Sequence, residues 1–141
     1  MEICSLIGRP SDDYEVAFRE LAEADNVYDA RVGSMMLELL ERLRRDSSTV
    51  TLFAFSQSPA ELSLLYASSS RVSAHVTVKI DRPDYAPLVD GKPPFHYRMS
   101  FVIQATEDST CRERPFEKRV QAVEDAYEFL NKAILEANRH S

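Results

Sequence analysis

Hydrophobic and polar residues alternate almost perfectly from Arg71 to Asp81. The apolar positions of this segment are Val72, Ala74, Val76, Val78 and Ile80. Successive side chains of a β-strand point to opposite sides, so the pattern predicts a strand with one dry face and one solvated face. One-sided strands are common in antiparallel sheets, whereas parallel strands are usually buried on both faces. The segment therefore predicts an antiparallel sheet.

The segment 95–105 repeats this alternation, which is broken only at Val102. It matches 71–81 in length and phase, so the two strands are predicted to pair as a hairpin. In this pairing His75 lies opposite Ser100, Thr77 opposite Arg98, and Lys79 opposite His96. The connecting segment 82–94 contains four prolines and Gly91. It is therefore expected to form a stiff, irregular loop.

Two further segments have strand character. Residues 49–56 are rich in β-branched and aromatic residues and apolar on both faces, which predicts a central strand. The segment 58–68 is ambiguous, because Ser58 and Glu61 with Pro59 between them match a helix capping box. Alternating apolar residues favour a strand at 61–67 instead, and we adopt the strand. The alternating residues are Leu62, Leu64 and Tyr66.

Helical spacing of apolar residues marks both ends of the chain. From Tyr14 to Leu43 they recur at intervals of three, four or seven, with a gap at Asp25 where a break or kink is expected. The segment 113–140 has the same spacing and predicts a second long helix, most clearly at 115–138. These elements predict a single α+β domain over 1–141. Its fold is a two-layer antiparallel meander of three to four strands, with long N- and C-terminal helices covering one face.

Charge narrows the range of partners. The 141 residues carry a net charge of −6, which suits nucleic acid poorly because phosphate contacts need clustered Lys and Arg. The apolar runs are too short to cross a bilayer, and the first residues lack the pattern of a signal peptide. We therefore expect a cytoplasmic protein that binds neither nucleic acid nor membrane. Cys4 and Cys111 are expected to be ordinary thiols.

The polar face of the predicted hairpin is the candidate binding site. It collects basic and histidine side chains into a locally basic platform on an acidic protein, suited to an anionic ligand or an acidic segment of a partner. The candidate residues on it are Arg71, His75, Lys79, His96 and Arg98. Tyr85, in the 82–94 loop, is a candidate for the lip of a pocket. A solvated face without any ligand and a face that packs on a second copy are the alternatives.

No catalytic, metal or cofactor motif accompanies this face. His75 and His96 lack an orienting acceptor at a suitable position and a third metal ligand at an obvious spacing. The chain has three glycines, none close enough to another to cradle a phosphate. No catalytic residue, metal ligand or cofactor is therefore predicted.

These features predict a non-enzymatic protein-interaction module of small acidic type: a chaperone, immunity or regulatory partner protein. The order helix, meander, helix is similar to that of secretion chaperones and toxin-immunity proteins, an analogy of architecture alone. The alternative is a small-molecule-binding domain or enzyme with its site on the polar sheet face beside the 82–94 loop. A homodimer is also expected, because some apolar residues do not fit the inward-facing stripes. These are Leu37, Phe129 and Leu135.

Overall fold

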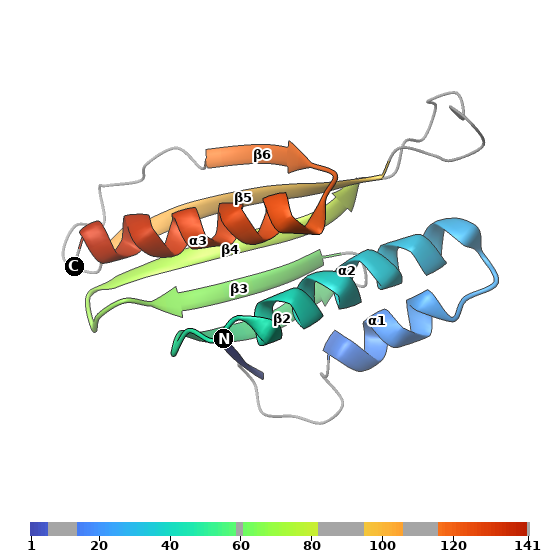
Figure 1. The fold of residues 1–141 in the computed structure, drawn as a ribbon, viewed down its shortest axis with the longest axis horizontal. Helices are drawn as coiled ribbons and strands as arrows, with labels where there is room; N and C mark the ends of the chain where they lie inside the picture. The colour runs from blue at the N-terminus through green and yellow to red at the C-terminus, as the bar shows by residue number, and fades with distance from the viewer. Residues whose placement is uncertain (6–13, 59–60, 82–94, 106–115, 141) are drawn as a thin grey trace.

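The computed structural model describes residues 1–5, 14–58, 61–81, 95–105 and 116–140. The chain is α+β, and the described residues form six strands and three helices (Figure 1). The strands are β1 (Glu2–Ser5), β2 (Thr51–Ser58), β3 (Glu61–Ala67), β4 (Val72–Asp81), β5 (His96–Ala105) and β6 (Phe116–Val120). The helices are α1 (Tyr14–Ala22), α2 (Val27–Arg45) and α3 (Val123–Arg139).

All six strands belong to one mixed sheet, in which spatial order follows chain order. Strands β2 to β6 form an antiparallel meander, and β1 pairs in parallel with β2. The expected three to four strands are therefore too few, and the sheet is not wholly antiparallel. The four residues of β1 are too short to give a periodic signal, and the helices that follow carry the chain back so that β2 runs parallel to it.

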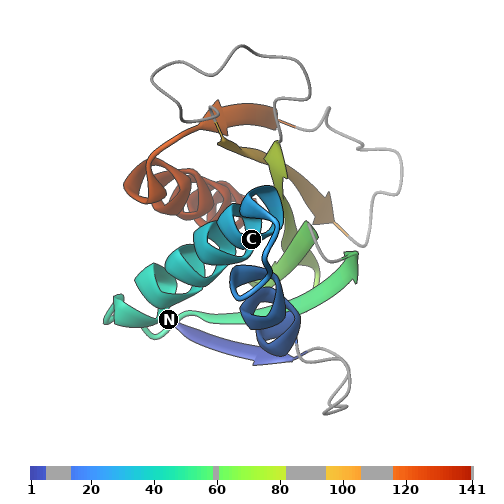
Figure 2. The ribbon, with the colours of Figure 1, turned by 90° about the vertical axis from the view of Figure 1, so that its right-hand side faces the viewer.

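The three helices lie on one side of the sheet (Figure 2). The expected break near Asp25 is confirmed, because α1 ends at Ala22 and α2 begins at Val27. Asn26 caps α2, since its side-chain oxygen accepts hydrogen bonds from the amides of Tyr28 and Asp29.

The β4–β5 hairpin forms, but its register differs by two residues from the expected one. His75 lies opposite Val102, Thr77 opposite Ser100, and Lys79 opposite Arg98. A shift of two residues keeps every side chain on its expected face, because the side-chain period of a strand is two. Alternation therefore identified the faces correctly. It could not distinguish between registers that differ by two residues, because these place the same side chains on each face.

Strand pairing decides the structure of two further segments. Residues 61–67 form β3, which pairs with β2 on one side and β4 on the other. The long helix expected over 113–140 is wrong in its first part, because Phe116–Val120 forms the edge strand β6 and α3 begins only at Val123. In a segment this short, Phe116 and Val120 fit a helical stripe and also the alternate positions of a strand.

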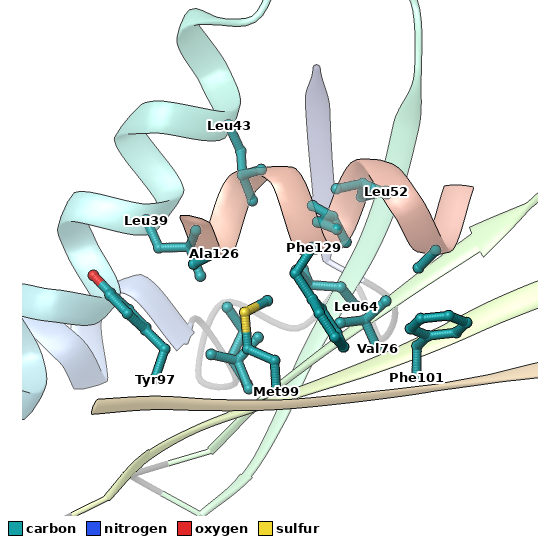
Figure 3. Close-up of a cluster of buried hydrophobic side chains, with 14 of the residues drawn as sticks. Leu39, Leu43, Leu52, Leu64, Val76, Tyr97, Met99, Phe101, Ala126 and Phe129 are labelled. Carbon is teal, nitrogen blue, oxygen red and sulfur yellow. The ribbon is translucent and has the colours of Figure 1, made fainter. Parts of the chain in front are cut away.

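The core lies between the sheet and the helices. Inward-facing residues of β2 to β5 contact the apolar sides of α2 and α3 (Figure 3). Tyr97 places its ring among them and donates a hydrogen bond of 2.7 Å from its hydroxyl to the carbonyl oxygen of Met35 in α2. Burial of the hydroxyl raises the pKa of Tyr97 above its ordinary value. This bond satisfies the one polar atom that Tyr97 brings into the core.

The expected dimer residues are distributed differently. Phe129 is only 4% exposed, so it belongs to the core of its own chain and is not available to a partner. Leu37 is half-buried and packs against the same core, whereas Leu135 is 59% exposed on α3. The helical pattern misplaced Phe129 because the stripe of α3 is wide enough to include it.

Candidate functional site: the open sheet face

The candidate site is the side of the sheet that faces away from the three helices (Figure 2). We call it the open face, and it consists of the outward-pointing residues of β2 to β6. The alternating burial of β4, in which every second residue from Val72 to Ile80 is buried, shows which residues point outward. Those outward residues fall into rows across the strands, because directly paired residues point to the same side.

One row is predominantly apolar. Phe53 pairs with Leu65, Leu65 with His75, and His75 with Val102. The row thus crosses four strands, and Phe55 lies beside it, with its ring centroid 5.8 Å from that of His75. Phe53 is 36% exposed, and Leu65 and Val102 are half-buried. We call these five residues, Phe53, Phe55, Leu65, His75 and Val102, the apolar row.

His75 is the one polar side chain of the apolar row, and its environment is unusual. Its Nε2 atom is buried and has no hydrogen-bond partner among the residues that the structure describes. An imidazole nitrogen is a donor or an acceptor in either tautomer, so leaving it unpaired and out of water costs free energy. Such groups in native structures call for an explanation.

This arrangement predicts that His75→Leu stabilises the isolated protein by about 1 kcal/mol, because leucine fills the space without an unpaired polar atom. Chemical denaturation followed by circular dichroism measures the change. His96→Leu is the matched control, since His96 lies at the end of the same face opposite Asp81. An equal gain from both substitutions, or a loss from His75→Leu, would contradict this account of His75.

The other end of the open face is charged but internally paired. The Nζ atom of Lys79 lies 3.8 Å from a carboxylate oxygen of Glu61. The two carboxylate oxygens of Asp81 lie 3.3 Å from Nε of Arg98 and 3.3 Å from Nε of Arg119. These groups occupy neighbouring rows across β3 to β6. The expected basic platform is therefore largely offset by two carboxylates. Pairs this exposed contribute little stability each, but together they define a polar border. One row of small polar residues separates this border from the apolar row: Ser63, Thr77 and Ser100.

The structure brings together only some of the predicted site residues. His75, Lys79, His96 and Arg98 share the open face, as expected. Arg71 lies in the exposed turn before β4, about 26 Å along the strand from Lys79 at about 3.3 Å per residue. Tyr85 and the 82–94 loop lie outside the described residues. The prediction missed the apolar members of the row, although Val102 had already interrupted the polar alternation of its strand.

Within the described ranges, no group of three or more His, Cys, Asp or Glu residues is placed to hold a metal ion. None of the described helices is both long and apolar enough to span a membrane. Comparisons with protein-family models, curated proteins and solved structures find no match to this chain. The chain is thus characterised by its own geometry: an α+β protein with helices on one side of a mixed sheet and a partly apolar open face on the other.

Proposed function

We propose that this chain is a non-enzymatic protein-interaction module that binds its partner through the open face. The observation that carries the proposal is the apolar row, which crosses four strands of the open face and includes Phe53 at 36% exposed. Protein interfaces combine a core of aromatic and aliphatic side chains, depleted of charge, with a polar rim. The apolar row and its ion-paired border have this composition, and both lie on one face of the sheet.

The ion-paired polar border indicates what charge the partner's surface carries. Because Glu61 and Asp81 offset Lys79, Arg98 and Arg119, the open face offers little net charge to attract an acidic segment. The apolar row favours instead an uncharged apolar surface of the partner.

A capture experiment with matched variants tests this proposal. The wild-type chain, Phe53→Ser and Leu135→Ser are immobilised and exposed to a lysate of the source cells, and bound proteins are identified by mass spectrometry. Phe53 belongs to the apolar row, whereas Leu135 is an exposed apolar residue of α3 on the opposite side. We expect a protein retained by the wild type and Leu135→Ser to be reduced about tenfold or more on Phe53→Ser, the loss that follows from removing an aromatic contact at the centre of an interface.

Leu65→Ser is a second variant of the same row, and circular dichroism verifies that every variant is folded. Equal retention of all partners by wild type, Phe53→Ser and Leu65→Ser would refute a role for the open face. Retention of no protein by the wild type would contradict the interaction module itself. The identity of a partner that depends on the row then assigns the chain to one of the expected kinds: chaperone, immunity or regulatory protein.

A further inference from the structure

The strand β6 forms one edge of the sheet, and no described strand pairs with its outer side. Its sequence is Phe116-Glu117-Lys118-Arg119-Val120, and its first four residues are exposed. An unpaired edge presents backbone N–H and C=O groups that can template another strand. Charged residues on such an edge usually discourage pairing with another strand. Pairing is favourable only with a strand whose charges lie opposite residues of the other sign, so the order of charges along β6 selects its partner.

The order of residues in β6 is complementary to itself when reversed. In an antiparallel pair of two copies centred on Lys118, Glu117 of each copy lies opposite Arg119 of the other. The same register sets Phe116 of each copy opposite Val120 of the other, an aromatic and β-branched pair of the kind that stabilises strand pairing. We propose that β6 pairs with β6 of a second copy of this chain, giving a symmetric dimer with a continuous sheet.

The two faces of this junction differ in chemistry. Phe116, Lys118 and Val120 lie on the helix side, because they pair with Phe101, Met99 and Tyr97, whose side chains are buried in the core. Glu117 and Arg119 therefore lie on the open face, where the dimer forms two ion pairs related by symmetry. In the single chain Arg119 instead reaches back across β5 to Asp81 of β4 at 3.3 Å. Dimer formation would turn this exposed side chain outward, towards Glu117 of the other copy.

One like-charge contact remains, between the two Lys118 side chains on the dimer axis. Lys118 lines a pocket of about 220 Å³ between β6 and α3, together with Asp125, Glu128 and Lys132. The two carboxylates balance the charges of Lys118 and Lys132 in this pocket. The contact between the two Lys118 side chains therefore remains unfavourable, and the two ion pairs on the open face have to outweigh it. Phe116 lines the same pocket and is 43% exposed, with Lys132 Nζ 4.1 Å from its ring centre. Pairing covers this exposed ring.

Charge reversal tests the register directly. Glu117→Arg sets the new arginine opposite Arg119 of the other copy, and Arg119→Glu sets the new glutamate opposite Glu117 of the other copy. Each variant alone is expected to be monomeric at 16.1 kDa at concentrations where the wild type has twice that mass. When the two variants are mixed in equal amounts, one copy of each brings opposite charges together at both ion-pair positions. The mixture is therefore expected to form a heterodimer. Light scattering after size exclusion measures the masses, and circular dichroism verifies folding.

Several outcomes would overturn the proposal. A wild-type monomer at about 200 µM would exclude the second copy as the occupant of this edge. A dimer that persists in Glu117→Arg would place the contact elsewhere, and a mixture that stays monomeric would refute the register. A further variant, Lys118→Cys in a Cys4→Ser, Cys111→Ser background, is expected to form an intermolecular disulfide because the paired positions are within bonding distance. Glu117→Cys, which is offset from its own copy, is the control. None of these outcomes depends on the apolar row.

Discussion

Replacing Phe129 with alanine is expected to lower the free energy of unfolding by about 3–5 kcal/mol, the range for removing a buried aromatic side chain. Phe129 extends from α3 towards the sheet and contacts Phe101 of β5 (Figure 3). Their ring centroids are 5.5 Å apart in an edge-to-face arrangement, and Phe116 of β6 stacks on Phe129 at 5.8 Å. The substitution therefore leaves a cavity where α3, β5 and β6 meet.

Urea denaturation monitored by circular dichroism measures this loss. Leu135→Ala is the matched control, because Leu135 lies on the same helix and is 59% exposed. The control is expected to change stability by less than about 0.5 kcal/mol. Similar small effects of both substitutions would mean that Phe129 is exposed in solution, as the helical pattern alone had suggested, and would contradict the packing of α3 on the sheet.

Replacing Gly33 with alanine is expected to destabilise the protein by about 2–3 kcal/mol through overpacking. Gly33 lies in α2 where α1 crosses it closely. A Cβ atom at this position would lie 2.3 Å from the backbone nitrogen of Ala22 and 2.4 Å from the carbonyl oxygen of Phe18. Both are backbone atoms, so the contact is relieved only when the two helices move apart.

The sign of this effect is diagnostic. Within an exposed helix, alanine in place of glycine stabilises by about 1 kcal/mol, because it restricts the unfolded backbone and favours the helix. Ser34→Ala, at the exposed neighbouring position, is the control and is expected to be neutral or slightly stabilising. Thermal unfolding of both variants measures the difference. A gain in melting temperature for Gly33→Ala would show that α1 does not approach α2 in solution.

Pairing through the proposed β6 edge determines how the open faces of the two copies are oriented. An antiparallel junction that continues the sheet has its two-fold axis perpendicular to the sheet, so both open faces of a β6-linked dimer point the same way. Two apolar rows would then be presented to one side. A partner with two copies of the matching surface would gain apparent affinity from simultaneous binding without any new contact. The monomeric Glu117→Arg variant would retain the single-site interaction but lose this gain.

Much of the sheet was readable from periodicity. The alternation in 71–81 and 95–105 identified both strands and their buried faces, because a side chain at every second position must point to the same side. The gap at Asp25 located the break between α1 and α2, since an acidic residue at a core position cannot continue the apolar stripe. Local pattern suffices where one residue spacing is compatible with only one structure.

Pairing between distant segments decided the rest. Phe116–Val120 fits both a helix and a strand, and its place against β5 made it a strand. The two-residue change of the hairpin register left the faces intact but brought His75 opposite Val102, within a row that also contains Phe53 and Leu65. Glu61 and Asp81 offset the basic residues only because strand pairing places Glu61 opposite Lys79 and brings Asp81 near Arg98. Sequence spacing along one strand therefore determined which face each residue occupies, whereas the residues beside it on that face were set by long-range strand pairing.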